Sequence, residues 1–387
     1  MGFQRQIREA LAELEAAGLL RSPVRISGPQ GPEVEINGAK VLCFCSNNYL
    51  GLASHPAIAA ASAASPANDG VGAAASRLVT GTMDAHLDAE AAYADFVHAP
   101  AAALFSSGYA ANVGAIQALA GPGDAIFSDA LNHASVIDGA RLSRAEVFVY
   151  SHRDPEHLQS LLAQHRARAR KALIVTDSLF SMDGVIAPLR ELHALARDYD
   201  AGLMVDEAHA LGVFGPNGRG LSAALGIEPD VIVGTLGKSF GLAGAFVAAS
   251  EEVVTLVRNR ARSFVYSTAP PPMLARAAIA ALRLVREADH ARVRLLEHAS
   301  KLRSGLAQSG FEIPEGESQI IPVLIGENRR TMQLSAKLLE RGVFVQGIRP
   351  PTVPAGTARL RLTPMATHQA EQIEQVIAAF ASIVLKR

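Results

Sequence analysis

Short apolar runs separated by longer stretches of helical composition fill the middle of the chain, from about residue 100 to residue 250. Continuous apolar runs that alternate with helices are typical of strands buried on both faces. The pattern predicts an α/β fold with an open, mostly parallel central sheet, helices on both faces and a functional edge at the carboxyl ends of the strands. The predicted strands are Ala102–Phe105, Ala125–Phe127, Val147–Tyr150, Ala172–Val175, Leu203–Val205, Val231–Val233 and Ala245–Ala248.

Helical periodicity precedes this region. Ile7, Leu11, Leu14 and Leu19 recur at helical spacing with charged residues between them, which predicts an amphipathic N-terminal helix that ends near Gly18. Ala-rich segments such as 57–65 have the composition of helices, so we expect helices there too.

After an Ala/Leu/Arg-rich stretch at 273–308, the chain mixes short strands with helices, which predicts a smaller α+β domain. We therefore expect three segments: an N-terminal helix with small strands at 1–45, a large domain at 46–285 and a C-terminal α+β domain at 286–387. The elements predicted for the last segment are Ile320–Ile325, a helix near 330–341, Val343–Gln346, Arg359–Leu362 and a final helix from residue 367.

Composition restricts the classes of partner. The 387 residues carry 36 basic and 37 acidic side chains, a formal net charge of -1, which gives no electrostatic basis for binding nucleic acid or an anionic membrane. No apolar run reaches the roughly 18 residues that a membrane span needs. A signal peptide would have an apolar run near the N-terminus, where this chain has Glu9, Glu13 and Glu15. Two cysteines are too few for a disulfide framework. We expect a soluble, cytoplasmic enzyme that acts on small molecules.

Lys238 is one of only six lysines and lies in a glycine-rich loop of low charge, Gly234-Thr-Leu-Gly-Lys-Ser-Phe-Gly-Leu-Ala-Gly244. A partly desolvated amine in such a loop has a lowered pKa, which suits Schiff-base chemistry. The alternatives are an ordinary surface lysine and a P-loop. Gly237-Lys-Ser239 matches the end of a P-loop, but the leading glycine is replaced by Ile232, so that motif fails.

Asp206 follows the predicted strand Leu203–Val205, and His209 comes three residues later. A carboxylate beside a pyridine nitrogen keeps that nitrogen protonated and makes the ring an electron sink, and His209 would then donate to the ring's phenolic oxygen. Asp206-Glu-Ala-His209 also matches the DEAH box of helicases, but the sequence has no Walker A motif and no surplus of basic residues. His133 also follows a strand and either stacks on a flat cofactor ring or is structural.

Several other side chains could bind anions. Ser106-Ser-Gly108-Tyr109 follows a strand and opens a helix, whose N–H groups form a phosphate cradle, and Thr235 and Ser267-Thr268 offer hydroxyls. Three arginines near the C-terminus either clamp a carboxylate or are exposed strand residues: Arg349, Arg359 and Arg361. Cys43 and Cys45 have no further ligands at the spacing of a metal site, so we expect core residues and no metal.

Taken together, these motifs resemble the α-oxoamine synthases, pyridoxal-5'-phosphate-dependent enzymes of fold type I. The resemblance runs along the whole chain, although Gly70–Arg77 is poorer in glycine than in many relatives and Asp206-Glu207 replaces the paired aspartates that some show. The matching segments are Ser46–Leu52, Ser106–Tyr109, Phe180–Gly184, Asp206–His209, Gly234–Lys238 and Tyr266–Thr268.

The resemblance implies a role for each residue around the cofactor. Lys238 would bind pyridoxal phosphate covalently and act as the base that abstracts the α-proton of the substrate. Asp206 would contact the pyridine nitrogen, and His133 would stack on the ring. The resemblance also places His209 and Ser181 near the ring oxygen and Gly108, Tyr109 and Thr235 at the phosphate, with Ser267 and Thr268 reaching in from a second subunit of a homodimer.

The resemblance extends to the substrates. Asn47 and Arg361 match the positions that hold the amino-acid carboxylate, and Arg21 and Thr352 match positions that contact the acyl substrate; His133 also lies on the substrate side. Ile348–Leu362 is most similar to family members that condense L-alanine with the pimeloyl thioester of coenzyme A or acyl carrier protein, releasing carbon dioxide and the thiol.

Other readings of the resemblance stay open. A sister enzyme would use glycine or serine, as do 2-amino-3-ketobutyrate CoA ligase, 5-aminolevulinate synthase and serine palmitoyltransferase. A non-catalytic carrier of pyridoxal phosphate would be yellow but inert, whereas a DEAH-type NTPase would be colourless and would bind nucleotide.

Overall fold

The computed structural model describes residues 2–384, which form two compact units. The large unit comprises Leu50–Ser181 and Val185–Arg292. The small unit comprises the residues up to Tyr49, the short segment Met182–Gly184 and the residues from Val293 onward. The three-segment division expected from the sequence stays a prediction.

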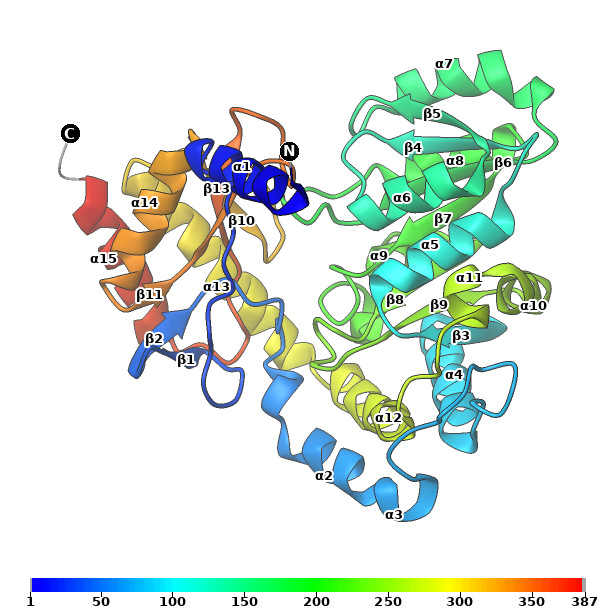
Figure 1. The fold of residues 1–387 in the computed structure, drawn as a ribbon, viewed down its shortest axis with the longest axis horizontal. Helices are drawn as coiled ribbons and strands as arrows, with labels where there is room; N and C mark the ends of the chain where they lie inside the picture. The colour runs from blue at the N-terminus through cyan, green and yellow to red at the C-terminus, as the bar shows by residue number, and fades with distance from the viewer. Residues whose placement is uncertain (1, 385–387) are drawn as a thin grey trace. The chain divides into compact units, whose positions relative to one another are not determined.

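A seven-stranded sheet forms the centre of the large unit (Figure 1). Its strands are β3 (Ala101–Phe105), β4 (Ala125–Asp129), β5 (Glu146–Tyr150), β6 (Ala172–Asp177), β7 (Gly202–Asp206), β8 (Val231–Thr235) and β9 (Ala245–Ala249). They lie in the order β3-β9-β8-β7-β6-β4-β5, and β9 alone runs antiparallel to its neighbours. Every residue of β4, β6 and β9 is buried, which explains why these strands are continuous apolar runs in the sequence.

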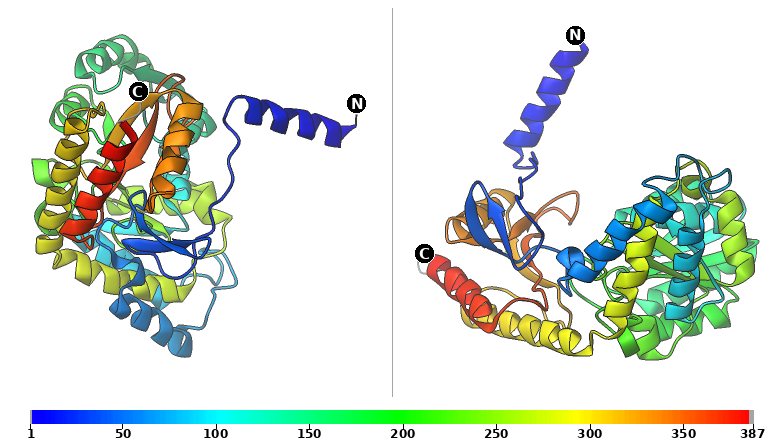
Figure 2. Two further views of the ribbon diagram at one scale, coloured as in Figure 1. Left: turned by 90° about the vertical axis from the view of Figure 1, so that its left-hand side faces the viewer. Right: turned by 90° about the horizontal axis from the view of Figure 1, so that it is seen from below.

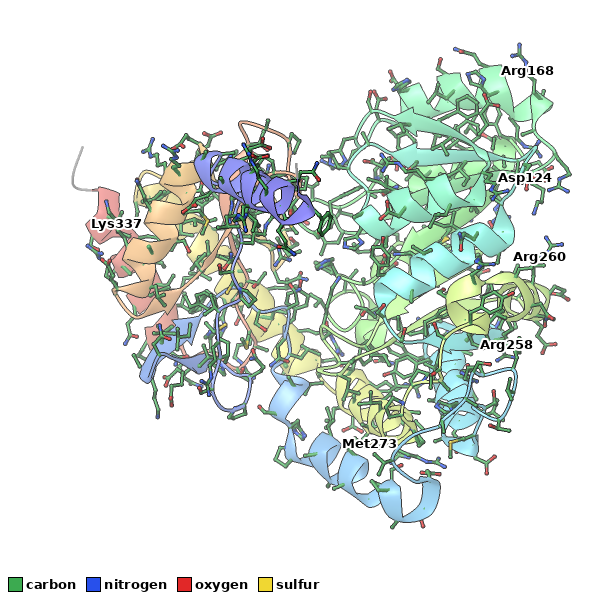
Figure 3. All side chains as sticks on the ribbon, viewed as in Figure 1. Asp124, Arg168, Arg258, Arg260, Met273 and Lys337 are labelled. Carbon is green, nitrogen blue, oxygen red and sulfur yellow. The ribbon has the colours of Figure 1, made fainter. Side chains whose placement is uncertain are left out.

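Helices cover both faces of this sheet. On one face, α5 (Gly108–Leu119), α6 (Ala134–Ser143) and α10 (Glu251–Arg260) share a core with alternate strand residues such as Val233 and Val247. On the other face, Phe246 points toward α4 (Asp84–Val97), where its ring lies 4.9 Å from that of Tyr93. Arg258 of α10, labelled in Figure 3, ties α10 to β3 because it donates to the Ala102 carbonyl (2.9 Å). The mostly parallel sheet with helices on both faces confirms the predicted fold class.

The large unit contains several further helices. The Ala-rich segment near 57–65 is helical, as predicted. These helices are η1 (Leu52–Ser54), α2 (Pro56–Ala64), α3 (Pro66–Asp69), α7 (Pro155–His165), η2 (Arg166–Arg168), α8 (Leu189–Asp198), η3 (Pro216–Gly218), α9 (Leu221–Leu225), α11 (Arg262–Val265) and α12 (Pro272–Arg286).

The small unit contains two three-stranded sheets. One has the order β1-β2-β11 and the other β10-β13-β12. The predicted strand Val343–Gln346 is divided between them, because Val343 pairs with β2 whereas Gln346 pairs with β13. The elements are β1 (Glu33–Ile36), β2 (Ala39–Cys43), β10 (Ile321–Gly326), β11 (Val343–Phe344), β12 (Gln346–Ile348), β13 (Ala358–Leu362), α14 (Asn328–Leu339), α15 (Ala370–Val384) and all but the first four residues of α13 (Asp289–Gln308).

The predicted N-terminal helix is α1 (Phe3–Ala16), and Gly18 follows it in a left-handed conformation (φ +66°). Figure 2 shows α1 projecting from the rest of the small unit. None of its residues is buried, so the apolar face that the periodicity indicates is exposed. At its C-terminal end, Arg329 donates to the Ala16 carbonyl (2.7 Å).

Candidate active site

Polar side chains end four of the parallel strands at one edge of the large-unit sheet. β4 ends on Asp129, β6 on Asp177, β7 on Asp206 and β8 on Thr235. Asp177 and Asp206 are paired in register on neighbouring strands. In open α/β sheets this carboxyl edge is where ligands bind, as the sequence predicts.

Asp206 is only 6% exposed, and both of its carboxylate oxygens accept hydrogen bonds. Oδ1 accepts from the Ala208 backbone N–H (2.9 Å), and Oδ2 accepts from Asn112 Nδ2 (2.6 Å). These two bonds fix the orientation of the carboxylate. His209 is buried in the turn that follows.

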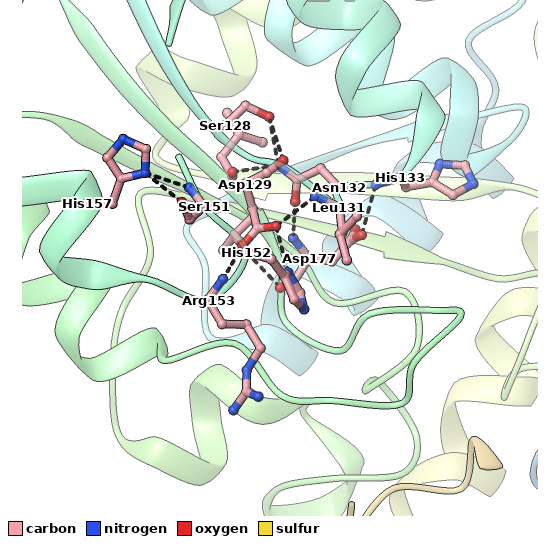
Figure 4. Close-up of polar contacts among 12 residues, drawn as sticks. Ser128, Asp129, Leu131, Asn132, His133, Ser151, His152, Arg153, His157 and Asp177 are labelled. Carbon is pink, nitrogen blue, oxygen red and sulfur yellow. Dashed lines mark hydrogen bonds and ion pairs between the residues drawn. The ribbon is translucent and has the colours of Figure 1, made fainter. Parts of the chain in front are cut away.

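Asp177 supports the loop that carries His133 (Figure 4). Its Oδ2 accepts from the His133 backbone N–H (3.0 Å), and its own N–H donates to Asn132 Oδ1 (3.0 Å). Burial raises the pKa of Asp177 well above its usual value; the charge of Asp206 adds to this effect and that of Lys238 opposes it. Figure 4 also shows a second support of this edge, in which His152 Nδ1 lies 2.8 Å from Asp129 Oδ1.

His133 caps the start of α6, where its Nδ1 accepts from the Ser135 backbone N–H (3.2 Å). Part of its surface faces solvent, which leaves room for a flat ligand. Removal of the rest of the ring from water lowers its pKa, an effect that the charge of Asp206 opposes and that of Lys238 reinforces.

Lys238 is half-buried in the loop that follows β8. A tight turn fixes this loop, because the Gly241 N–H donates to the Lys238 carbonyl (2.9 Å). Gly241 has a φ of +69°, and a Cβ atom there would lie 2.4 Å from the Ala53 backbone nitrogen, so the turn requires glycine. The positive charge of Lys238 lowers the pKa of both His133 and Asp177. The predicted reactive lysine therefore lies near the same strand ends as these two residues.

The helix start that was predicted to bind phosphate is that of α5, which begins at Gly108. Ser107 caps α5 by accepting from the Ala110 N–H (3.1 Å), and the first N–H groups of a helix have no intrahelical acceptor. Thr235 lies beside this helix start, since a Cβ atom on Gly108 would be 3.8 Å from Thr235 Oγ1. The Tyr109 hydroxyl is turned away from it and donates to Asp138.

The remaining predicted cofactor contacts are also in the large unit. Ser181 is half-buried after β6. Thr268 is exposed and forms an isolated antiparallel bridge with Ser76, and Ser267 beside it is half-buried. A buried carboxylate, a primary amine and a helix start flanked by a hydroxyl fit pyridoxal phosphate, whose pyridine nitrogen, aldehyde and phosphate need those three groups.

The three C-terminal arginines are buried, so their interpretation as exposed strand residues is wrong. Arg361 donates through Nη1 to Asn47 Oδ1 (3.1 Å) and through Nη2 to the Tyr49 hydroxyl (3.4 Å). Arg359 is occupied by an ion pair with Asp183. Of the three, Arg361 therefore lies in the polar cluster that contains Asn47, the other residue predicted to hold a carboxylate.

The structure also brings together the two residues predicted to contact the acyl substrate. The Arg21 side chain is exposed, and its Nη2 donates to the Pro350 carbonyl (3.0 Å) and to Thr352 Oγ1 (3.5 Å). Arg21 and Thr352 thus form one polar cluster in the small unit, although they are far apart in the sequence.

Comparison with known proteins assigns the family. Residues 39–380 match the family described as aminotransferase class I and II. The chain belongs to this family. Among its curated members, 8-amino-7-oxononanoate synthase from Geobacter metallireducens is 49% identical over 98% of either chain. No group of three or more His, Cys, Asp or Glu within residues 2–384 could hold a metal ion.

Solved structures of the aminotransferase class I and II family share the fold. A serine palmitoyltransferase from Sphingomonas wittichii is 35% identical with a TM-score of 0.92, covering 98% of this chain and 96% of its own. The 8-amino-7-oxononanoate synthase from Francisella tularensis is 29% identical with a TM-score of 0.77, covering 89% and 98%. Related serine palmitoyltransferases were solved with pyridoxal phosphate. These findings confirm the predicted family, fold type and cofactor.

The sequence interpretation missed three polar residues at this site. Asp177 carried the same signal as Asp206, because each ends a buried apolar strand. Asn112 is a buried polar residue within the mostly apolar helix α5, and Ser135 is the second residue of α6. Their contacts join segments remote in the sequence, so spacing along the chain did not reveal them.

Proposed function

We propose that this chain condenses L-alanine with a pimeloyl thioester to give 8-amino-7-oxononanoate, carbon dioxide and a thiol, a step of biotin biosynthesis in the cytoplasm. The observation that carries the proposal is the 49% identity over 98% of the chain to a curated 8-amino-7-oxononanoate synthase. The acyl donor is pimeloyl-CoA or pimeloyl-acyl carrier protein.

When bound, pyridoxal phosphate supplies a ring that withdraws electrons from the α-carbon of the attached amino acid. Lys238 would hold the cofactor through its amine, and the same amine would accept the proton from the α-carbon of the substrate. Asp206 would keep a proton on the pyridine nitrogen, and His133 would stack on the ring. His209 and Ser181 bind the ring oxygen.

The remaining residues bind phosphate and substrates. Gly108, Tyr109 and Thr235 hold the phosphate. Arg361 and Asn47 orient the alanine carboxylate until it leaves as carbon dioxide, and Arg21 and Thr352 contact the pimeloyl chain. A guanidinium matches the bidentate geometry of a carboxylate, which supports Arg361 in this role.

A homodimer would complete the site, with Ser267 and Thr268 of each subunit contacting the cofactor held by the other. Exposed apolar side chains near these residues support the dimer. Val79 is 76% exposed and Tyr266 is 72% exposed, and Val71 and Leu78 are also exposed. Such a group on a monomer is typical of a protein interface.

The proposal is tested by measuring thiol release from pimeloyl-CoA with L-alanine, glycine and L-serine in parallel, using protein loaded with pyridoxal phosphate. Release with L-alanine, together with the amino-ketone product, is the expected result. Release with L-serine and a palmitoyl thioester instead would move the chain to the activity of the serine palmitoyltransferases among its structural neighbours. A yellow protein that releases no thiol from any donor would contradict the enzymatic proposal.

A further inference from the structure

A continuous run of hydrogen bonds joins Asp206 to His133 through two buried side chains. Asn112 Nδ2 donates both to Asp206 Oδ2 (2.6 Å) and to Ser135 Oγ (2.9 Å). Ser135 Oγ lies 2.7 Å from His133 Nδ1. Asn112 is 1% exposed and Ser135 is fully buried. The run connects β7, α5 and the start of α6, three elements that are remote in the sequence.

The direction of each bond follows from the chemistry of the groups. A backbone N–H can only donate, so the bond from the Ser135 N–H to His133 Nδ1 (3.2 Å) requires an unprotonated Nδ1. A neutral imidazole then carries its proton on Nε2. Because Ser135 Oγ accepts from Asn112, its own hydrogen is directed to the same Nδ1.

The orientation of the Asn112 amide is fixed in the same way. An ionised carboxylate only accepts, so the amide nitrogen must face Asp206. The other end of the amide is unsatisfied: Asn112 Oδ1 is buried and has no hydrogen-bond partner among residues 2–384. A buried acceptor without a partner destabilises the fold, so the two donated bonds point to a role beyond stability.

We propose that Asn112 and Ser135 are positioning residues that fix the Asp206 carboxylate and hold His133 as the neutral tautomer with its proton on Nε2. This inference deepens the proposed function and rests on it for the roles of Asp206 and His133. In this state His133 presents an N–H donor to the ligand site and adds no positive charge near Lys238.

The charges facing the His133 ring include both signs. Asp206 at the end of β7 and Asp138 on α6 favour the protonated ring, whereas Lys238 on the β8 loop opposes protonation. Asp177 on β6 binds the backbone N–H of His133, not the ring. Burial of the ring, which lowers its pKa, outweighs the two carboxylates, and the hydrogen bonds to Nδ1 determine which ring nitrogen carries the proton.

The test uses cofactor-free protein with 15N-labelled histidine, because the nitrogen chemical shifts of an imidazole distinguish a protonated from an unprotonated ring nitrogen. The His133→Gln variant assigns the His133 signals. The wild type is expected to show one protonated and one unprotonated nitrogen through neutral pH. In Asn112→Leu, which removes both donors at similar volume, mixed tautomers are expected and the pH of ring protonation shifts upward.

Affinity for pyridoxal phosphate gives a second readout, measured by absorbance titration. Asn112→Leu should bind the cofactor about 10- to 100-fold more weakly, since it removes a hydrogen bond to a charged carboxylate. Ser135→Ala, which leaves the bond to Asp206 in place, should alter the His133 signals and change the affinity less. Ser143→Ala on the same helix is the control, because its buried hydroxyl bonds only to the local backbone and should change neither readout.

Unchanged His133 nitrogen shifts in both Asn112→Leu and Ser135→Ala would overturn the proposal. If Asn112→Leu does not fold, Ser135→Ala decides it alone. The nitrogen shifts are measured without cofactor or substrate, so a protein inactive with L-alanine and pimeloyl-CoA but with the expected shifts would contradict the proposed function and not this inference.

Discussion

At the scale of single residues, two neighbouring carboxyl groups of the sheet differ because their surroundings differ. Asp206 receives hydrogen bonds on both oxygens, including one from the Asn112 amide. Asp177 is buried and lies beside the charge of Asp206, and both effects raise its pKa. The hydrogen bonds on both oxygens of Asp206 fix the orientation of its carboxylate toward the ligand site.

Replacing Lys238 with alanine tests the reactive amine. No other lysine lies in this loop, so Lys238→Ala should lose covalent attachment of pyridoxal phosphate and essentially all turnover. Borohydride reduction followed by mass spectrometry should show the added cofactor mass on the wild type and not on the variant. Lys171→Ala, a change at an exposed lysine that binds the Leu119 carbonyl, is the control. Covalent attachment in Lys238→Ala would disprove the assignment.

The raised pKa of Asp177 makes a prediction about stability and pH. The folded protein binds this proton more tightly than the unfolded chain does. The stabilisation is therefore complete below the unfolded pKa and is lost as the pH rises through the folded pKa. The wild type should therefore lose stability as the pH rises, whereas Asp177→Asn should not, because asparagine cannot ionise. The Tm of Asp177→Asn minus the Tm of the wild type should increase between about pH 4 and about pH 8.

Asp124, labelled in Figure 3, provides the opposite case for the same measurement. Burial alone would raise its pKa, but hydrogen bonds from Arg170 and the Gly121 N–H hold it below the usual value. Its stabilisation is present above the unfolded pKa and is lost as the pH falls through the folded pKa. The Tm of Asp124→Asn minus that of the wild type should therefore decrease as the pH rises. The same trend in both variants would refute this explanation.

At the scale of elements, the sequence predicted what depends on local pattern. All seven strands of the large sheet were predicted because each contains a continuous apolar run, although the edge strand β5 is largely exposed. The strand ends then brought Asp206 and Thr235 to one edge. The division of 343–346 between two sheets was not predicted, because the pairing partners of β11 and β12 lie far away in the sequence. The sequence also did not predict that α1 is exposed, because periodicity identifies an apolar face but not the element that packs against it.

The turn after Lys238 is the element most sensitive to a small change. Gly241→Ala combines a left-handed φ with a Cβ atom 2.4 Å from the Ala53 backbone, so it should cost roughly 2 kcal/mol or more and displace Lys238. Gly226→Ala is a matched control, since Gly226 has a φ of +66° with no atom within 4 Å of the added Cβ. Thermal unfolding and absorbance titration with pyridoxal phosphate measure both effects. Equal losses in the two variants would rule out the clash with Ala53.

At the scale of the whole molecule, the cofactor residues of one chain fall into two groups. Lys238, Asp206 and His133 act on one another within the large unit. Thr268 is exposed and forms an isolated antiparallel bridge with Ser76. Val79, three residues after Ser76, is also exposed. We expect Ser267 and Thr268 to serve the cofactor of a second copy of the chain, because a two-fold axis would then give each subunit the same contact.

Mixed dimers test this sharing directly. A subunit with Lys238→Ala lacks the reactive amine, and a subunit with both Ser267→Ala and Thr268→Ala should bind the phosphate weakly enough to be idle at limiting cofactor. If each site takes Lys238 from one subunit and the hydroxyls from the other, a mixed dimer contains one intact site and one doubly altered site. Random exchange makes about half of the dimers mixed, so the mixture should recover about one quarter of wild-type activity. Activity no higher than the average of the two parents would mean that both hydroxyls act within their own subunit.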